Sequence, residues 1–338
     1  MNRSSDSRPD RTPEPLRVRP AGGTRRHALR TAGALALAPL LSACQEPVAP
    51  MRLGSIVFPG YEFVFLAREQ GWLDERQVRL IELRSNTDAL RALASGQLEA
   101  AMLTLDEMLS ARADGIDLKL VLILDVSDGA DVVLARPPLT LRDLKDRRVA
   151  VEDSAGGVIM LSSVLAAAGL RIEQVRKVSY TLDRSVDFYA QGKADVLVTA
   201  EPWASQIERL GARRLYDSRS IPGRIVDVLA VRADALARHA PALRRVVASH
   251  FRAQAFWRQQ PDVAAYPLAP RLQLRPSEVA GALKGLELPG VQDNRAWMEG
   301  GGQLAQTLRD LQTAMRRDKL LQRHVVLADI VDTSFLPD

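Results

Sequence analysis

Residues 96–107, GQLEAAMLTLDE, encode the end of one helix, a buried strand and the start of the next helix. Gly96 is a typical residue just after the last turn of a helix. The run from Leu98 to Leu103 is apolar enough to be covered on both faces. Thr104 and Glu107 have the spacing of a capping box, in which each side chain bonds to the other residue's backbone amide. This order predicts an α/β protein with a mostly parallel sheet covered on both sides.

The same alternation of short apolar runs and helical patterns continues along the chain. It predicts strands at 53–57, 78–83, 98–103, 118–124, 131–135, 149–151, 194–199 and 225–231. It predicts helices at 63–70, 88–95, 154–168, 202–210, 241–259, 276–285 and 303–316, and one that starts at Thr104. Helices between parallel strands indicate a doubly covered sheet.

A weak internal repeat indicates two lobes. Residues 192–199, GKADVLVT, repeat the pattern of residues 96–103: a glycine, an acidic residue three places later, then a buried strand. Any α/β unit shows some of this pattern, so the repeat alone leaves a single lobe open. We expect one lobe at 45–136 plus 230–338 and the other at 137–229. Pro137-Pro138 is the expected first crossing between them.

The only cysteine of the chain, Cys44, ends the run Leu41-Ser42-Ala43-Cys44. Before it stand three arginines, at 25, 26 and 30, and an apolar run of about ten residues, where a membrane-spanning helix needs ~20. This order resembles a bacterial lipoprotein signal, which implies cleavage of residues 1–44 and a lipid on Cys44. We therefore expect a protein anchored in the periplasm or at the cell surface. Export by the Sec or the twin-arginine route stays open, as does a cytosolic protein with a disordered arm.

The net charge of +5 comes from the leader. Residues 1–44 hold eight Arg and three Asp or Glu, and the rest balances at 38 basic and 38 acidic residues. A neutral remainder lacks the positive surface that phosphate backbones require. The charge distribution argues against nucleic acid as a partner.

Four motifs in order resemble the nitrate, sulfonate and taurine binding proteins of ABC importers, a group that includes binders of thiamine-pyrimidine precursors. They are FPGYE with FLAREQGWL (residues 58–62 and 65–73), LASGQLEAA (93–101), LRDLKDRRVAV (141–151) and AEPW (200–203). The resemblance implies a two-lobed periplasmic-binding-protein fold of type II, in which two mostly parallel sheets are joined by a two-strand hinge. It implies a small-molecule ligand in the cleft and, as partners, a permease and through it an ATPase. We expect a monomer.

Candidate ligand contacts follow from the rule that open α/β sheets bind ligands beyond the carboxyl ends of their strands. In the first lobe they are Gly60, Tyr61, Glu62, Asn86, Thr87, Thr104, Ser127 and Asp128. In the second lobe and at the return crossing they are Ser154, Gly156, Gly157, Glu201, Trp203 and Asp227. Some have simpler explanations: Ser154 and Thr104 as helix caps, Trp203 as core, and Asp128 as part of a turn.

The charge of these loops favours one kind of ligand over another. Glu62, Asp128, Glu201 and Asp227 are acidic, and only Arg84 nearby is basic. A small strong anion is usually held by Arg or Lys. A nitrogen-rich or aromatic ligand suits carboxylates and the rings of Tyr61 and Trp203 better. The family resemblance keeps the sulfonate, nitrate and taurine class open as well as the thiamine-pyrimidine precursors.

We expect no catalysis. The sequence has no Gly-x-Ser-x-Gly elbow, no His-Glu-x-x-His pair and no phosphate-binding Gly-x-x-x-x-Gly-Lys. We assign no catalytic residue, no metal ligand and no cofactor. Two alternatives remain: an exported enzyme of this fold related to the pyrimidine synthases, and a ligand-sensing subunit of a membrane receptor.

Overall fold

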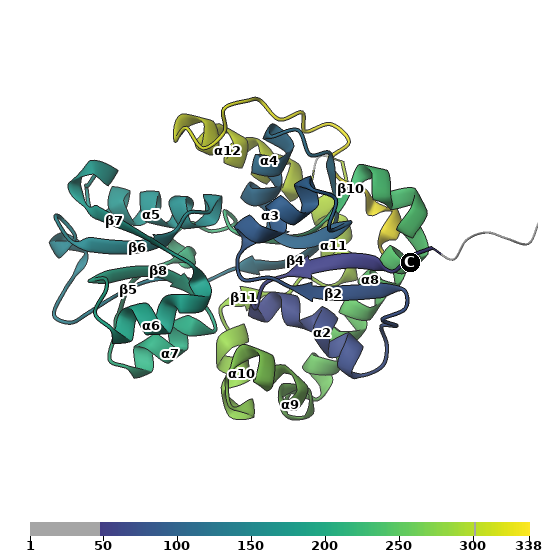
Figure 1. Ribbon diagram of the computed structural model, residues 1–338, viewed down its shortest axis with the longest axis horizontal. Helices are drawn as coiled ribbons and strands as arrows, with labels where there is room; N and C mark the ends of the chain where they lie inside the picture. Colours follow the sequence, from purple (N-terminus) through teal and green to yellow (C-terminus); the bar gives the residue numbers. More distant parts are fainter. Residues whose placement is uncertain (1–47, 301) are drawn as a thin grey trace, which may run out of the picture. The chain divides into compact units, whose positions relative to one another are not determined.

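The computed structural model describes residues 48–300 and 302–338, which form two β-sheets with helices packed on them (Figure 1). The first sheet contains β1 (Met51–Ser55), β2 (Val78–Glu82), β3 (Ala100–Thr104), β4 (Leu118–Ser127), β10 (Val226–Arg232) and β11 (Leu286–Glu287). The second contains β5 (Asp131–Ala135), β6 (Arg148–Glu152), β7 (Arg176–Tyr180), β8 (Val196–Ala200) and β9 (Arg213–Asp217).

Both sheets have the same strand order. The first runs β11-β4-β10-β3-β1-β2 and the second β9-β5-β8-β6-β7. The strand that arrives from the other sheet is antiparallel to both of its neighbours: β10 lies between β3 and β4, and β5 lies between β8 and β9. The strands β1, β2 and β3 are parallel to one another, and so are β6, β7 and β8. The predicted two-lobed α/β class is confirmed, with two sheets that are mixed, since each contains two parallel and at least two antiparallel strand pairs.

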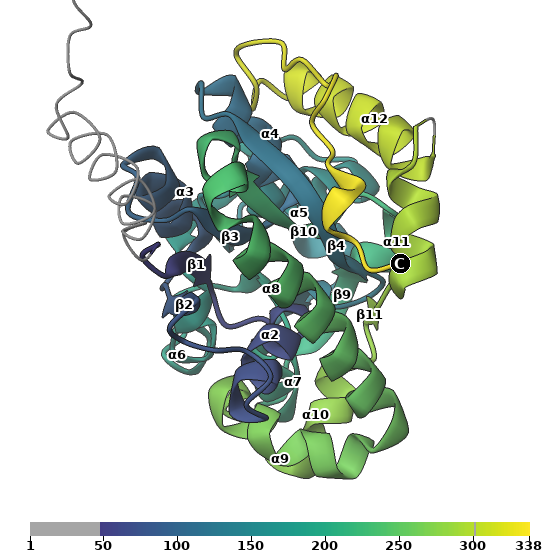
Figure 2. The same cartoon turned by 90° about the vertical axis from the view of Figure 1, so that its right-hand side faces the viewer.

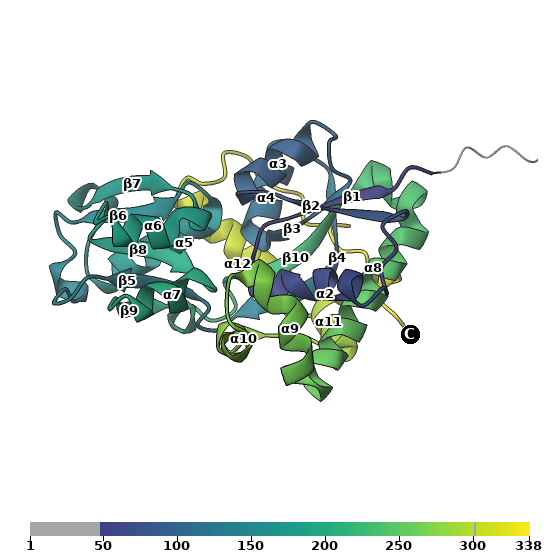
Figure 3. The same ribbon diagram turned by 60° about the horizontal axis from the view of Figure 1, so that its bottom comes forward.

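Helices lie on both faces of each sheet (Figure 1). In the first lobe they are α2 (Glu62–Glu69), α3 (Asn86–Ala94), α4 (Leu105–Ala113), α8 (Ala233–Gln259), α9 (Pro261–Leu272), α10 (Pro276–Leu283), α11 (Val291–Met298) and α12 (Gln303–Arg317). In the second they are α5 (Ala155–Ala167), α6 (Ser185–Ala190) and α7 (Trp203–Arg209). Figure 2 shows the long helix α8 crossing the first sheet, where it packs against α2. Figure 3 shows the strands of the second sheet side by side.

The predicted position of the first crossing, Pro137-Pro138, is wrong. Because β5 pairs with β8 and β9, the chain passes between the sheets at residues 128–130, before β5. It returns between the 3-10 helix η6 (Ser218–Ser220) and β10. A five-residue apolar strand such as β5 fits either sheet, and its partners come from residues far along the chain, so local pattern could not assign it.

The two connecting segments lie next to each other. The hydroxyls of Ser127, at the end of β4, and Ser218, in η6, are 2.8 Å apart. The backbone amide of Gly129 donates to the same Ser218 hydroxyl at 2.6 Å. The connection between the lobes is therefore a pair of short segments joined by hydrogen bonds.

The internal repeat read from the sequence corresponds to equivalent positions in the two sheets. The acidic residue before β3, Glu99, accepts hydrogen bonds from the backbone and guanidinium of Arg52 in β1. Asp195, before β8, accepts the same two kinds of bond from Arg148 in β6. Each pair ties two neighbouring strands together, β3 to β1 in the first sheet and β8 to β6 in the second.

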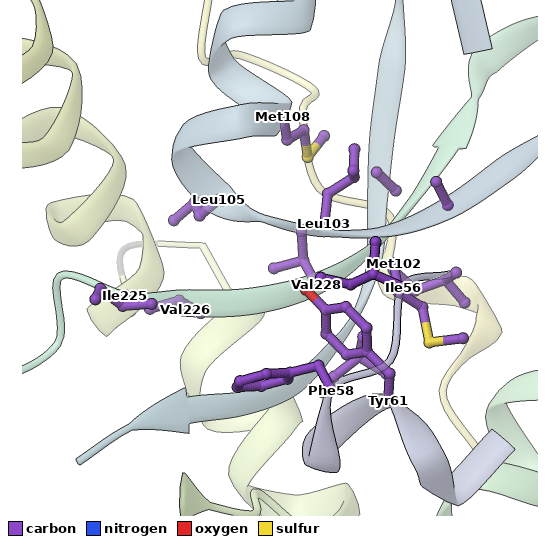
Figure 4. Close-up of a cluster of buried hydrophobic side chains, with 14 of the residues drawn as sticks. Ile56, Phe58, Tyr61, Met102, Leu103, Leu105, Met108, Ile225, Val226 and Val228 are labelled. Carbon is purple, nitrogen blue, oxygen red and sulfur yellow. The ribbon is translucent and has the colours of Figure 1, made fainter. Parts of the chain in front are cut away.

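The core of the first lobe is a continuous apolar cluster under α2, α4 and α8. Figure 4 shows part of it, where Phe58 and Tyr61 lie beside Met102 and Val228 of the sheet. The helix predicted to begin at Pro241 begins at Ala233 instead, and Pro241 lies inside it. Proline favours a helix start, but the eight residues before it, of which Ala235 and His239 are buried, continue the helix here.

Candidate functional site

A small cavity of about 50 Å³ lies between the two lobes. Three helices begin at it: α3 at Asn86, α4 at its N-cap Thr104 and α5 at its N-cap Ser154. Its other lining residues are Glu107, Asp131, Glu152, Gly156, Gly157, Met160, Leu182, Val198, Thr199 and Ile225. The cavity thus lies at the carboxyl ends of β3, β6 and β8, where α/β sheets bind ligands.

Local sequence explains how the second lobe shapes its side of the cavity. Ser154 accepts a hydrogen bond from the amide of Gly157 at 3.2 Å and so caps α5. A Cβ atom at Gly157 would lie 2.5 Å from the backbone oxygen of Glu152, so only glycine fits this close turn. The turn holds the Glu152 side chain at the cavity.

Local sequence does the same on the side of the first lobe. Glu107 forms one half of the capping box predicted from the spacing of Thr104 and Glu107, because the Thr104 amide donates to Glu107 Oε2 at 3.0 Å. The other half is not formed, since the Thr104 hydroxyl has no partner among the described residues. The cap fixes the Glu107 carboxylate at the start of α4, beside the cavity. One residue therefore serves as a helix cap and as part of the lining.

Three carboxyl groups line the cavity, and burial raises the pKa of each. The pKa of Glu152 rises from 4.5 to about 7 and that of Asp131 from 3.8 to about 6. The pKa of Glu107 rises well above its usual range because of burial and the neighbouring carboxylate of Asp106. Buried acids without a cationic partner hold their protons more tightly. No Lys or Arg is among the described residues that line this cavity.

Several polar atoms at the cavity have no hydrogen-bond partner within the described part of the chain. They are Asn86 Oδ1, Thr104 Oγ1, Asp131 Oδ2 and Glu152 Oε1. Asn86 and Glu152 are each 5% exposed. Buried polar groups in folded proteins nearly always have partners. Acceptors left open around one cavity indicate that a bound molecule supplies the donors.

A second cavity of about 240 Å³ adjoins the first and shares Glu152 and Leu182 with it. Its lining includes Trp203 from the second lobe, and Arg84 and Arg271 from the first. The two cavities meet at these two residues, and the first cavity is the acidic chamber lined by Glu107, Asp131 and Glu152. We call them the inner and the outer cavity.

The structure brings together five of the predicted ligand contacts in the inner cavity: Asn86, Thr104, Ser154, Gly156 and Gly157. It places Trp203 in the outer cavity. The other eight line neither: Gly60, Tyr61, Glu62, Thr87, Ser127, Asp128, Glu201 and Asp227. Most of those have partners inside the protein instead.

Tyr61 and Asp227 belong to a buried group behind the inner cavity. The Tyr61 hydroxyl donates to Asp227 Oδ1. Asp227 faces Asp125 across the β10–β4 pair, and both carboxyls are buried. Burial raises the pKa of Asp125 to about 7, and burial together with Asp125 raises the pKa of Asp227 well above its usual range. Gly60 permits this arrangement, because a Cβ there would lie 1.7 Å from Asp125 Oδ2.

Glu62 and Glu201 are buried, and each has a partner in its own lobe. Arg271 of α9 donates to Glu62 Oε2 at 2.7 Å, which offsets part of the rise in the Glu62 pKa that burial causes. Ser205 donates to Glu201 Oε1 at 2.9 Å. Ser127 bonds within the connecting segments, as described above, and Asp128 is exposed. These contacts account for the positions of Glu62, Glu201 and Ser127 without a bound ligand.

Sequence reasoning missed the three acids that line the inner cavity. Glu107 was read only as a cap, Asp131 as the first residue of a strand, and Glu152 lay one residue beyond the predicted strand 149–151. A candidate list that started at the first residue beyond that strand, and not at Ser154, would have included Glu152. Asp131 could not be found, because its place depends on which sheet β5 joins.

Larger hollows exist elsewhere on the described surface. One of about 650 Å³ lies between α5 and α12 and is lined mostly by partly exposed residues. It contains none of the buried unpartnered atoms that surround the inner cavity. We therefore take the inner cavity as the candidate site.

No helix within residues 48–300 and 302–338 has the length and apolarity needed to cross a membrane. No group of three or more His, Cys, Asp or Glu there is arranged to hold a metal ion. Cys44 and the predicted signal lie outside the described residues.

The sequence matches the NMT1-like family over residues 44–268, about two thirds of the chain, and the chain belongs to that family. No curated protein matches the sequence. The family membership agrees with the resemblance stated from the four motifs.

Solved structures share the fold. The alkanesulfonate-binding protein SsuA from Xanthomonas axonopodis pv. citri, bound to MOPS, is 20% identical, with a TM-score of 0.71 over 86% of this chain and 100% of that one. The periplasmic nitrate-binding protein NrtA from Synechocystis PCC 6803 is 13% identical, with a TM-score of 0.59 over 85% and 92%. The desulfurization enzyme DSZB is 18% identical, with a TM-score of 0.60 over 85% and 97%. The fold is that of periplasmic binding proteins, and it hosts an enzyme as well.

Proposed function

We propose that this chain is the extracytoplasmic solute-binding protein of an ABC importer, anchored by a lipid on Cys44. A small nitrogen-containing metabolite binds in the inner and outer cavities and is delivered unaltered to a permease. The observation that carries the proposal is a polar cavity between the lobes, with side chains from both and open acceptor atoms that need donors. Family membership and the fold of two solved transport proteins support it.

The connection between the lobes supports a mechanism of closure. Only the paired segments at 128–130 and 218–225 lead from one sheet to the other. A hinge of two short segments allows rigid lobes to rotate around a ligand. The inner cavity receives residues from both lobes, so a ligand there bonds to both at once and favours the closed form.

The test is to purify the full chain from bacterial membranes and identify what is bound by native mass spectrometry. Small-angle scattering should then show a smaller radius of gyration with the ligand than without it. Asn86→Leu should abolish binding, because it removes the open acceptor from the inner cavity. Gln97→Leu is a control on an exposed residue of the same lobe and should bind normally.

Two results would contradict the proposal. A compound that leaves the protein chemically changed would favour the enzyme alternative. The fold is compatible with that alternative, since the desulfurization enzyme DSZB shares it. Ligand binding without any change in the scattering curve would remove the closure mechanism. A Cys44→Ala variant that stays in the membrane fraction would remove the lipid anchor but leave the solute-binding function.

A further inference from the structure

We propose that the inner cavity selects a small organic cation, whose protonated nitrogen lies among Glu107, Asp131 and Glu152. This inference rests on the proposed function and names the ligand class of the same site. It separates the chain from two of the fold relatives above, whose printed names specify the anions sulfonate and nitrate.

The first argument is the inventory of groups at the cavity. Its described lining has three carboxyl groups and no basic side chain. Asn86 adds an acceptor that is not acidic: its Oδ1 is buried, lines the cavity and has no partner. An amidinium group carries four N–H donors and no acceptor, so it can satisfy all four residues at once, whereas a primary ammonium group carries three donors and can satisfy three of them. A sulfonate or nitrate carries only acceptors and satisfies none of the ionised groups.

The partial positive charges of the helix N-termini oppose the binding of a cation, so their sum must be compared with the charge of the carboxylates. Each helix N-terminus carries a partial charge of about +0.5, so α3, α4 and α5 together contribute about +1.5. Part of this is already used, because Ser85 caps α3, Ser154 caps α5 and Glu107 closes the box of α4. Three ionised carboxylates contribute −3. The cavity is therefore negative once its acids are ionised.

More acidic groups surround the lining and act in the same direction. Asp106 lies beside Glu107, and both its oxygens are buried without partners. Asp153 and Asp183 act on Glu152. Basic side chains occur around the cavity but not in its lining. Arg84 and Arg271 line the outer cavity, where Arg271 is already paired with Glu62 and Glu82, and Lys177 is paired with Asp153.

The competing possibility is that the acids stay protonated and donate to an anion. Proton linkage distinguishes the two, because their signs are opposite. A cation binds to ionised carboxylates and releases protons, so its affinity rises with pH. With the Glu152 pKa at about 7, the ionised fraction of that group rises about tenfold between pH 6 and pH 8. An anion held by carboxylic acids takes up protons, and its affinity falls.

The experiment compares matched probes on the purified full chain by calorimetry. The pairs are benzamidine with benzenesulfonate, and ethanolamine with 2-hydroxyethanesulfonate, with methylammonium and nitrate as the smallest members. Titrations in buffers of different ionisation enthalpy count the protons released. We expect the cations to bind, with about tenfold higher affinity at pH 8 than at pH 6 and with net proton release.

Glu152→Gln should weaken binding of the cations about 10- to 100-fold, the range for a lost hydrogen bond to a charged group, and lower the proton release. The variant keeps the size of the side chain and removes an unpartnered buried acid, so it should fold. Glu173→Gln, an exposed acid of the same lobe, is the control and should leave both quantities unchanged.

Two sets of results overturn the inference. Binding of the anions with closure of the lobes, while the cations do not bind, removes the ligand class but keeps the proposed function. Failure of every cationic probe to bind removes it as well. Cation binding that Glu152→Gln does not weaken, or that takes up protons, places the cation elsewhere and also contradicts it.

Discussion

Asp125→Asn should make the protein more stable at neutral pH, although it changes a fully buried residue. Asp125 and Asp227 are opposite each other on β4 and β10, and neither oxygen of Asp125 has a partner. Two carboxyl groups in this position form a hydrogen bond only while one of them holds a proton. Asparagine has the same shape and donates an N–H to Asp227 at any pH.

The size of the effect follows from the pKa of Asp125. Burial raises it from 3.8 to about 7. Each unit of difference corresponds to 1.36 kcal/mol, so the ceiling is about 4 kcal/mol. We expect roughly 2 kcal/mol, because the buried amide has a desolvation cost of its own and because the two acids titrate as a pair.

The direction of the pH dependence also follows from the raised pKa of Asp125. The folded state holds the proton more tightly than the unfolded state, so the cost is absent below pH 4, where both states are protonated. It grows as the pH rises from about 4 to about 7, and the free energy of unfolding falls accordingly. The gain from Asp125→Asn should therefore be less than half of its full size at pH 5 and close to its full size at pH 8.

Urea unfolding of the full chain at both pH values, followed by circular dichroism, measures the gain. Asp128→Asn, which changes an exposed acid three residues later, is the control and should shift neither midpoint. An equal gain at pH 5 and pH 8 would show that the pair does not share a proton. Loss of stability at pH 8 would show that the Asp125 carboxylate has a partner that we have not identified.

Three further changes test other contacts. Tyr61→Phe should lower the free energy of unfolding by about 1–3 kcal/mol, more at pH 8 than at pH 5, because the buried Asp227 loses its donor; pH-dependent urea unfolding measures this. Arg271→Ala should cost about 3–5 kcal/mol, because Glu62 stays buried without its partner, and adding Glu62→Gln should restore part of the stability in the same assay. Cys44→Ala should move the protein from the membrane to the soluble fraction, detected by immunoblotting after fractionation; persistence in the membrane would contradict the sequence-based signal.

The elements of the fold could be predicted because their signals are local. The strand β3 and the start of α4 were predicted from adjacent residues. In the structure β3 lies within two residues of its predicted bounds, and α4 starts after its predicted N-cap, Thr104. Apolar runs and caps act through nearest neighbours, so they are visible in one stretch of sequence.

The candidate site was predicted only in part because it depends on long-range pairing. Asn86, Ser154 and their neighbours were found, since helix starts after strands are local features. The acidic chamber was not found. Asp131 reaches it only because β5 joins the second sheet, and Asp125 meets Asp227 only through the register of β4 and β10. No local pattern specifies either pairing.

The acidic chamber has an energetic consequence that connects stability with function. Burial raises the pKa of Glu107, Asp131 and Glu152, so the fold without a ligand disfavours the ionised forms of its own buried acids. Apolar residues of similar size would fill the same space without that cost. Sequence and fold usually agree except at functional sites, where a local conflict is resolved by a ligand. A cation would replace the protons, satisfy the open oxygens and bond to both lobes, so the free energy that destabilises the empty cavity would contribute to binding and closure. The fold alone carries no such preference, since its relatives include proteins named for anions and an enzyme. The ligand class must therefore be read from the residues of this cavity.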